Sequence, residues 1–311
     1  MVSILLATFN GEKYLKSLLD SLEKQTFHEW ELIVLDDCSE DLTWEILNSY
    51  KLAAKHKIQL YRNSCRKGSG KDNFFELMKI CDGEYVMFCD QDDVWCSDKI
   101  EKELGALRKL ERQYGKNIPL LVHSDMVVVD EELSVIDNSY YHYARYKKNG
   151  DLQLHLCINR IPGCSVIFNR CTLKFCKRSL ESKKIIMHDS WVALIAYAMG
   201  KVEFIDKGLT LYRQHQNNSL GAANANNIRY KIMRILNRNN MKMENREHIV
   251  QASYFFEQYC NDILDGRVKK MLMDYSKLAH QSLAAYIFIC IKYKIFKYPM
   301  SRAVFQLISG C

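Results

Sequence analysis

The chain has 311 residues, 48% of them hydrophobic and 26% charged, with 13 glycines and 3 prolines. This composition fits a globular protein with a substantial core, and it excludes long linkers and low-complexity tracts. The net charge of +7 is carried by the C-terminal part, because residues 222–311 hold 14 Lys and Arg against 6 Asp and Glu. An acidic partner is therefore expected for that part alone.

The chain is expected to remain in the cytosol. Val2–Ala7 has no basic leader and ends in polar residues, so it predicts a buried strand rather than a signal peptide. The longest uncharged apolar run, Leu283–Ile291, stops at Lys292, well short of the roughly 18 residues that a membrane span needs. The twelve cysteines include no Cys-x-x-Cys pair, which favours free thiols over disulfides or a zinc site.

Strand and helix patterns alternate through the first 130 residues. Apolar runs predict strands at Val2–Ala7, Glu31–Leu35, Ile58–Tyr61, Glu84–Cys89 and Leu120–Val129, the last broken by His123, Ser124 and Asp125. Apolar residues at helical spacing predict helices at Glu12–Gln25, Leu42–His56, Asn73–Cys81 and Lys99–Tyr114. Strands that alternate with helices are typical of a parallel, doubly wound α/β sheet, in which ligands bind at the carboxyl ends of the strands.

The pattern changes twice further along the chain. Gly163–Phe168 and Lys201–Tyr212 predict strands on either side of a helix over Ser190–Met199. After Gly221 the patterns are all helical, at Ile228–Leu236, Ile249–Ile263, Val268–Ala279 and Leu283–Phe296. We place a domain boundary near residue 221.

An acidic cluster, Asp90 to Asp93, follows the fourth predicted strand. Three carboxylates in four residues repel one another unless a cation neutralises them, and Mg²⁺ and Mn²⁺ favour oxygen ligands that they often share with phosphates. The same residues also suit a solvated turn that caps the next helix, and Asp93 is expected to serve as such a cap.

A second acidic cluster, Asp36 to Asp41, follows the second predicted strand. An Asp at a strand end can accept the imide N–H of uracil or thymine, although an Asx turn with a helix cap uses the same residues. Because two acidic clusters lie at the ligand-binding edge of one sheet, the metal and nucleotide interpretation gains weight.

These motifs together resemble glycosyltransferase family 2, whose members have the GT-A fold. The N-terminal signature of that family is similar to Ser3–Gly11, Gln25–Phe27 and Glu31–Asp41, and its metal-binding motif is similar to Gly83–Trp95. The Asp-Gln-Asp-Asp-x-Trp form resembles the bacterial rhamnosyltransferases of the family. The resemblance covers about residues 1–220 and implies a GT-A catalytic domain over 1–221, with a nucleotide-sugar half at about 1–125 and an acceptor half at about 126–221.

The resemblance implies roles for six residues around the nucleotide sugar. They are Thr8 and Asn10 lining the nucleotide pocket, Asp37 at the pyrimidine base, Lys71 near the nucleotide, Asp90 at the ribose or sugar, and Asp92 on the metal. The implied cofactor is Mg²⁺ or Mn²⁺, because a divalent cation stabilises the charge of a departing diphosphate without proton transfer.

The resemblance also assigns residues beyond the first half. Asp189, in the run Met187 to Trp191, matches the catalytic base, which takes the proton of the acceptor hydroxyl in an inverting single displacement. In the late motif that begins at Leu211, Arg213 is expected at the diphosphate and His215 at the metal or diphosphate. Weaker expectations place Asp125, His188 and Trp191 at the sugar or acceptor; for Asp189 the alternative is a helix cap, and for Trp191 a core position.

The basic helical extension, residues 222–311, has two interpretations. Its mixture of large apolar and basic residues, as in Tyr286–Tyr298, suits an anionic membrane surface. The same helices can instead pack on the catalytic domain or form a homodimer. Nucleic-acid binding is not expected, because the basic residues follow no known reading motif.

The resemblance as a whole implies transfer of a sugar onto a growing, lipid-linked bacterial surface polysaccharide. The first candidate for the donor is dTDP-L-rhamnose, which supplies L-rhamnose. UDP-glucose, UDP-galactose and UDP-GlcNAc are alternative donors. A catalytically silent GT-A scaffold or glycan-binding subunit is the alternative of another class. A nucleotidyltransferase is disfavoured, because Thr8 to Glu12 is not the Gly-rich basic loop that such enzymes carry after the first strand.

Overall fold

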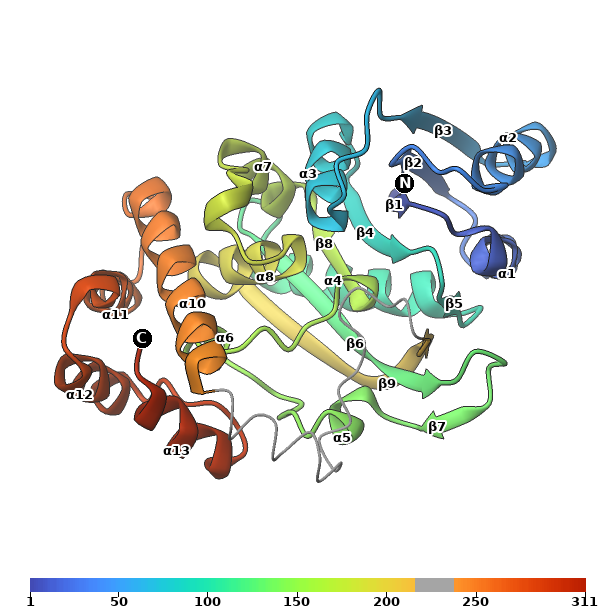
Figure 1. Cartoon of the computed structure of the whole chain (residues 1–311). Coiled ribbons are helices and arrows are strands. Elements are labelled where there is room, and N and C mark those ends of the chain that lie inside the picture. Colours follow the sequence, from blue (N-terminus) through green and yellow to red (C-terminus); the bar gives the residue numbers. More distant parts are fainter. Residues whose placement is uncertain (216–237) are drawn as a thin grey trace.

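The computed structural model describes residues 1–215 and 238–311 and contains one nine-stranded sheet (Figure 1). Its strands are β1 (Val2–Thr8), β2 (Trp30–Asp36), β3 (Lys57–Arg62), β4 (Tyr85–Asp90), β5 (Val94–Trp95), β6 (Leu120–Val129), β7 (Val135–Asp137), β8 (Val166–Asn169) and β9 (Lys201–Arg213). The order across the sheet is β3-β2-β1-β4-β8-β6-β9-β5, and β7 pairs with β6.

The helices of the first two thirds of the chain connect these strands. Four more helices are described from residue 238 onward. The first group is α1 (Glu12–Glu23), α2 (Thr43–Ala53), α3 (Gly70–Ile80), α4 (Lys99–Tyr114), α5 (Tyr140–Tyr143), α6 (Leu152–His155), α7 (Arg170–Arg178) and α8 (His188–Met199). The second group is α10 (Arg238–Tyr259), α11 (Gly266–Ser276), α12 (Leu283–Tyr293) and α13 (Met300–Ser309).

The predicted α/β fold is confirmed, but the sheet is mixed rather than purely parallel. Strand β8 runs antiparallel to β4 and to β6, while β1 to β4, β6 and β9 share one direction. The predicted strand at Gly163–Phe168 begins with a 3₁₀ turn, Gly163–Ser165, before β8. The polar residues His123 to Asp125 do not break β6; they coincide with a register shift against β9.

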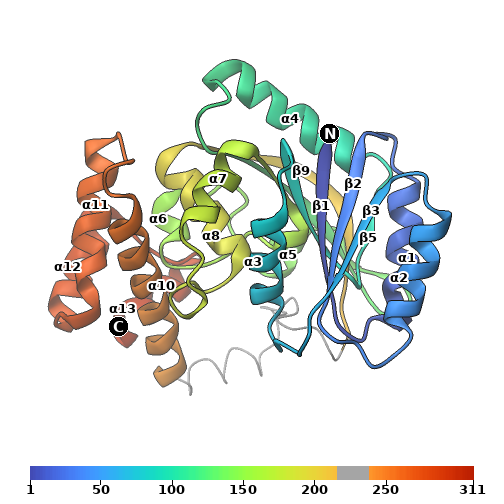
Figure 2. The ribbon, with the colours of Figure 1, turned by 90° about the horizontal axis from the view of Figure 1, so that it is seen from above.

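Helices cover both faces of the sheet (Figure 2). Alternate residues of β1 divide between the two faces, since Ile4 and Leu6 pack with α1, α2 and α4, whereas Leu5 packs with α3, α7 and α8. This alternation follows from the pleat of a strand, which points successive side chains to opposite faces. The two resulting cores fix the position of the carboxyl edge of the sheet, where the candidate residues lie.

The C-terminal helices pack against the helices of the first two thirds of the chain. Trp191 of α8 is fully buried against three rings of α10, with centroid distances of 5.5 Å to Tyr254, 5.8 Å to Phe255 and 6.0 Å to Tyr259. Helices α10, α11 and α12 contribute to the same hydrophobic core as α3 and α8. The boundary expected near residue 221 and the helix expected at 228–236 lie outside the described residues.

Within the described residues, no helix combines the length and the apolar character that a membrane crossing requires. Helix α13 is absent from the sequence-based expectations. Its apolar residues do recur at helical spacing after Pro299, but they are few and half of them face solvent.

Replacement of Trp191 tests whether α10 is an integral part of the catalytic fold. We expect Trp191→Ala to lower the free energy of unfolding by about 3–5 kcal/mol, because a buried indole is lost and a cavity remains. Urea unfolding followed by circular dichroism should show one transition at lower urea. The control is Leu264→Ala, since that side chain is 94% exposed. A Trp191→Ala loss below about 1 kcal/mol would contradict this packing.

Candidate functional site

The candidate residues gather at one edge of the sheet because the strands that carry them run in the same direction. Strands β1, β2, β4 and β9 end at Thr8, Asp36, Asp90 and Arg213, and these ends lie at the carboxyl edge (Figure 1). Helix α8 begins at His188. The order of the strands therefore brings together segments that are up to 200 residues apart in the sequence.

Thr8 and Asn10 join the loop after β1 to the loop after β2. Thr8 is buried, and its Oγ1 donates to Asp36 Oδ1 at 3.1 Å. Asn10 has a φ of 45° and accepts from the backbone N–H of Glu40 at 2.9 Å. The hydroxyl of Thr8 is directed to Asp36, and the expected place of Thr8 in the nucleotide pocket stays a prediction.

Asp37 organises the loop that follows β3. Its Oδ1 accepts from Asn63 Nδ2 and from Lys67 N, both at 2.7 Å, and its Oδ2 accepts from Gly68 N at 2.8 Å. Burial opposes ionisation, but these hydrogen bonds outweigh it and hold the pKa of Asp37 below its usual value. The side chain is thus a charged acceptor; Oδ1 already accepts two hydrogen bonds, and Oδ2 still has a lone pair for a further donor.

Lys71 lies in the first turn of α3 and reaches the segment before α8. Its Nζ donates to the carbonyl oxygen of Ile185 at 2.8 Å. This contact ties α3 to the segment that precedes α8, the helix that carries Asp189.

Gln91 is a site residue that the sequence analysis left without a role. Its side-chain amide pairs with the backbone of Phe9, because Nε2 donates to Phe9 O and Phe9 N donates to Oε1, each at 2.9 Å. A Cβ at Gly11 would clash with Gln91 Oε1, so a larger residue there would displace this side chain from its pairing with Phe9. The pair locks the acidic cluster to the end of β1, and only the adjacent glycine hints at it in the sequence.

Asp92 and His215, the two expected metal ligands, lie in contact. Their Oδ2 and Nε2 atoms are 2.7 Å apart, and the side chains are 19% and 9% exposed. The ring of Tyr14 packs against the imidazole at a centroid distance of 4.9 Å. The fold therefore brings an oxygen and a nitrogen ligand from β4 and β9 to one accessible point.

A second group of potential ligands lies deeper. The side chains of Asp90, Asp93 and Cys164 have oxygen and sulfur atoms within 4.8 Å of one another. Burial raises the pKa of the Cys164 thiol, and a protonated thiol is a poor ligand for a hard cation. Asp93 is fully buried and accepts from Arg213 N at 3.1 Å, while α4 begins only at Lys99, so its expected role as a helix cap is wrong.

Arg213 holds the acidic loop from behind. Its Nε donates to the carbonyl oxygen of Asp92 at 2.8 Å, its Nη1 donates to that of Glu131, and its carbon Cζ lies 4.6 Å from the ring centre of Tyr14. The residue is 4% exposed. The guanidinium is directed to backbone carbonyl groups, and the expected contact of Arg213 with a diphosphate stays a prediction.

Asp189 lies at the start of α8 with its carboxylate held on one side. Asn159 Nδ2 donates to Oδ1 at 2.9 Å, and Ser190 N donates to the same oxygen at 2.6 Å. Burial raises the pKa of Asp189 to about 6 despite these hydrogen bonds. Burial and the charges of Asp92 and Asp189 likewise raise the pKa of Asp90 to about 7. No sequence motif pointed to Asn159.

His188 is buried between aromatic rings. It stacks on Phe74 at a centroid distance of 4.0 Å and meets the edge of Phe88 at 4.7 Å. Burial lowers its pKa to about 3, with help from the positive charge of Lys71, so the ring is neutral. Neither ring nitrogen has a hydrogen-bond partner among the described residues.

Two further candidates are committed to other contacts. Trp191 is fully buried beneath α10, so its expected contact with an acceptor is wrong and its alternative core position holds. Asp125 is buried in β6, where its Oδ2 accepts from Ser139 Oγ at 2.5 Å and lies 3.8 Å from Lys148 Nζ. The expected contact of Asp125 with a sugar is therefore replaced by an anchor for the start of α5.

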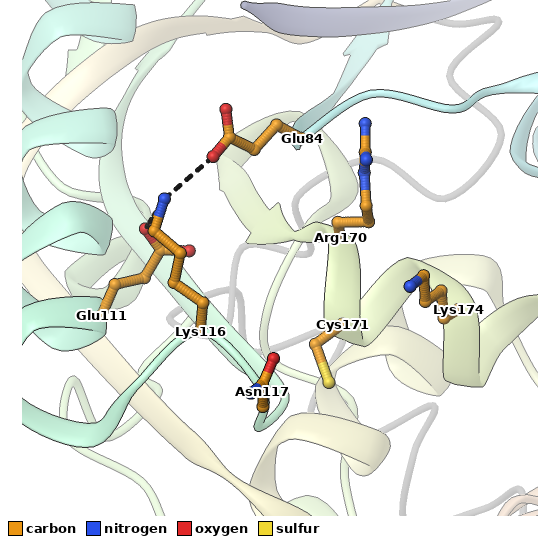
Figure 3. Close-up of a pocket in the computed structure, with 7 residues that line it drawn as sticks. All are labelled: Glu84, Glu111, Lys116, Asn117, Arg170, Cys171 and Lys174. Atoms are coloured by element: carbon orange, nitrogen blue, oxygen red, sulfur yellow. Dashed lines mark hydrogen bonds and ion pairs between the residues drawn. The ribbon is translucent and has the colours of Figure 1, made fainter.

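A hollow of about 320 Å³ lies at the opposite edge of the sheet (Figure 3). Glu84, which precedes β4, faces Lys116 across it with an ion pair of 3.0 Å, and Arg170 of α7 lies beside them. Arg170 is bound to the carbonyl oxygen of Asp82 at 2.6 Å. This hollow is remote from the carboxyl edge and contains none of the candidate residues.

The arrangement of Arg213 predicts a structural effect. We expect Arg213→Lys to lower the free energy of unfolding by about 1–3 kcal/mol in protein without nucleotide, because an ammonium cannot reproduce the fork of hydrogen bonds. Thermal unfolding provides the measurement. Arg66→Lys is the matched control, since Arg66 is exposed and lies over Phe9. A residue that only contacted the diphosphate would leave stability unchanged and weaken donor binding alone.

Comparison with known sequences gives a family and several relatives. Residues 3–167 match the model of glycosyl transferase family 2. The dTDP-rhamnosyl transferase RfbG of Shigella flexneri is 28% identical over 237 residues, which cover 73% of this chain and 77% of RfbG. The UDP-Glc:alpha-D-GlcNAc-diphosphoundecaprenol beta-1,3-glucosyltransferase WfaP of Escherichia coli is 34% identical over 128 residues, which cover 41% of this chain and only 49% of WfaP.

Comparison with solved structures shows a shared fold. Residues 1–349 of Staphylococcus aureus TarS, in complex with UDP-GlcNAc, superpose with a TM-score of 0.56 at 17% identity, covering 99% of this chain and 90% of the other. The mannosyltransferase PcManGT from Pyrobaculum calidifontis, in complex with GDP-Man and Mn²⁺, gives 0.53 at 14% identity, covering 99% and 85%.

The family model ends before Asp189, Arg213 and His215, so it does not bear on these residues. It nevertheless covers more than half of the chain and includes both acidic clusters. The chain therefore belongs to glycosyl transferase family 2 and is a glycosyltransferase with the GT-A fold.

Proposed function

We propose that this glycosyltransferase is metal-dependent and moves a sugar from a nucleotide sugar onto a growing surface glycan with inversion. The observation that carries the proposal is the 2.7 Å contact between Asp92 and His215 at the carboxyl edge of the sheet. The carboxylate oxygen of Asp92 suits Mg²⁺ or Mn²⁺, and the imidazole nitrogen of His215 favours Mn²⁺, the softer of the two. The relative PcManGT, solved with GDP-Man and Mn²⁺, lends further support.

In this proposal, Asp92 and His215 hold the cation beside the donor diphosphate. A divalent cation, when bound, supplies positive charge where the leaving group becomes more negative. Arg213 and Gln91 keep the loop of Asp92 in place through the backbone contacts described above. Asp90 is proposed to face the donor ribose or sugar, and Asn10, Asp37 and Lys71 to lie around the nucleotide.

Asp189 is proposed as the base that takes the proton from the acceptor hydroxyl. Its raised pKa supports this role, because a buried carboxylate with a pKa of about 6 accepts a proton more readily than an exposed one. The hydrogen bond from Asn159 orients the carboxyl group. Attack by the acceptor oxygen on the anomeric carbon, on the face opposite the diphosphate, then inverts the configuration in one step.

The donor that we favour is dTDP-L-rhamnose. Support comes from the name of RfbG and from the Asp-Gln-Asp-Asp-x-Trp run at residues 90–95. UDP-glucose is the second candidate, since WfaP is named as using UDP-Glc. Asp37 does not separate them, because thymine and uracil present the same imide N–H to an acceptor.

The acceptor that we favour is a lipid-linked glycan at the cytoplasmic face of a membrane. WfaP is named as acting on a diphosphoundecaprenol-linked sugar, which supports an acceptor of this class. The enzyme then works from the cytoplasmic side, where nucleotide sugars are the donors.

The donor and the metal can be tested together. Purified protein is incubated with dTDP-L-rhamnose, UDP-glucose, UDP-galactose or UDP-GlcNAc, with Mn²⁺ or with a chelator, and release of the nucleoside diphosphate is measured. We expect release from dTDP-L-rhamnose, lost on chelation and reduced roughly a hundredfold or more by Asp92→Asn or His215→Gln. Asp82→Asn is the control, since that side chain is 94% exposed on the remote edge. Turnover unaffected by chelation would remove the metal from the proposal.

The base is tested by its pH dependence. Asp189→Asn is expected to reduce kcat by roughly 10²–10⁴-fold with an unchanged Tm, because the amide keeps the Oδ1 contacts but accepts no proton. In the wild type, the pKa of about 6 predicts that kcat/KM falls as the pH drops through that value, because protonation removes the base. Asn159→Ala removes a hydrogen bond that favours the charged carboxylate, so this acidic limb should shift to higher pH. An Asp189→Asn enzyme with wild-type turnover would exclude this base.

A further inference from the structure

The last two helices form a hairpin, residues 283–309, at the end of the molecule remote from β3 (Figures 1 and 2). Gln306 of α13 donates to Tyr286 OH of α12 at 3.1 Å. A Cβ at Gly310 would lie 2.8 Å from Leu283, so the end of α13 adjoins the start of α12. The inner side of this C-terminal hairpin is buried and belongs to the core.

The outer side of the C-terminal hairpin is unusually apolar for an exposed surface. On α13, Met300, Val304 and Ile308 recur every four residues and are 77%, 48% and 49% exposed. On α12, Phe288 and Ile291 are 63% and 58% exposed. Leu283 and Tyr298 are exposed too, so seven of the seventeen exposed large hydrophobic side chains of the described residues lie after residue 282. Such a concentration marks an interaction surface.

The same segment lacks negative charge. Residues 275–311 contain five Lys and Arg and no Asp or Glu. A hollow of about 210 Å³ opens between the loop before α6 and the link from α12 to α13. Three lysines and one carboxylate line it among apolar groups: Lys147, Lys294, Lys297 and Asp151, with Leu154, Phe296, Tyr298, Met300 and Ala303. Basic groups therefore outnumber the single acidic one around this opening.

These features decide between possible occupants. A second copy of the chain would bring two basic surfaces together, which repel each other. A nucleic acid would use the lysines but would gain little from exposed aliphatic side chains. An anionic lipid surface suits both the lysines and the exposed apolar side chains. Aliphatic and aromatic side chains insert at the acyl boundary, while lysines bind phosphate groups.

We propose that the C-terminal hairpin docks on an anionic phospholipid membrane, with the outer side chains of α13 inserted and lipid phosphates bound by Lys147 and Lys294. Helices α12 and α13 have 11 and 10 residues, so the contact is peripheral. This docking proposal rests on the proposed function in one respect: a lipid-linked acceptor gives the enzyme a reason to lie at a membrane. Docking itself requires neither donor nor turnover.

The surface is continuous with the acceptor side of the catalytic domain. Arg302 of α13 donates from Nη2 to the carbonyl oxygen of Ala144 at 3.0 Å. Four residues later, Lys148 offers its carbonyl oxygen to Arg160 Nη1 at 3.0 Å. Arg160 is the neighbour of Asn159, which holds Asp189. A membrane bound at the hairpin is thereby connected through packed groups to the candidate base.

Vesicle flotation of the full chain tests the docking surface. We expect the protein to float with phosphatidylcholine vesicles that contain phosphatidylglycerol, to stay behind with phosphatidylcholine alone, and to detach at high salt. The triple variant Met300→Ser, Val304→Ser, Ile308→Ser should bind roughly tenfold or more weakly. Lys147→Gln and Lys294→Gln should each weaken binding about fivefold. Leu52→Ser is the matched control, since Leu52 is 90% exposed on α2 at the other end of the molecule.

Equal flotation of the triple variant and the wild type would overturn the proposal, as would equal binding to neutral and anionic vesicles. Light scattering of the wild type and the triple variant gives a further outcome. A dimer that dissociates in the triple variant would show instead that this surface joins two copies. Release of nucleoside diphosphate with a water-soluble acceptor should be the same in the triple variant and the wild type, which separates a failure of docking from a failure of the catalytic proposal.

Discussion

The constraint on which this structure depends is the mutual repulsion of carboxylates at the carboxyl edge of the sheet. Asp90, Asp92 and Asp93 follow one strand, and Asp189 contributes to the raised pKa of Asp90. Neighbouring carboxylates in a partly buried site repel one another, so the surrounding structure must hold them together. Here β4 lies in the sheet between β1 and β8, and α8 is wedged beneath α10, so neither carrier can relax away from the other.

Arg213 and Gln91 hold these carboxylates in place through hydrogen bonds to the loop that carries them. The guanidinium of Arg213 lies behind the loop and donates to the carbonyl oxygen of Asp92. The backbone N–H of Arg213 donates to the carboxylate of Asp93. Gln91 fastens the same loop to the end of β1. The accessible side of the loop is left to Asp92 and His215. The carboxylate of Asp92 then faces His215, and this pair is what we propose to hold a cation beside a diphosphate.

The sequence predicted most of the fold, because each strand and helix of the first half carries a periodic pattern with clear ends. The amphipathic helix α4 occupies Lys99–Tyr114, as expected from its periodicity. Roles inside the site were harder, since a residue type does not say which way its side chain turns. Thr8 and Arg213 lie at the expected strand ends yet contact protein groups. Asn159 escaped notice because its partner Asp189 is 30 residues away and no local pattern joins them.

The same reasoning explains why the C-terminal extension was ambiguous from sequence and is less so in the structure. An amphipathic helix has one apolar side, and a sequence cannot say whether that side meets the core or another surface. Helix α10 packs its apolar side on the core, where Tyr254 contacts Trp191. In helix α13, Ala303 and Gln306 are buried while Met300 and Val304 face outward. The buried side is covered by the rest of the fold, and the outward apolar side is the one that we propose to meet a membrane. The chain of contacts from Arg302 to Asn159 also connects the outward side of α13 to Asp189, and a fixed distance is what the proposed base would require of an acceptor anchored at that side.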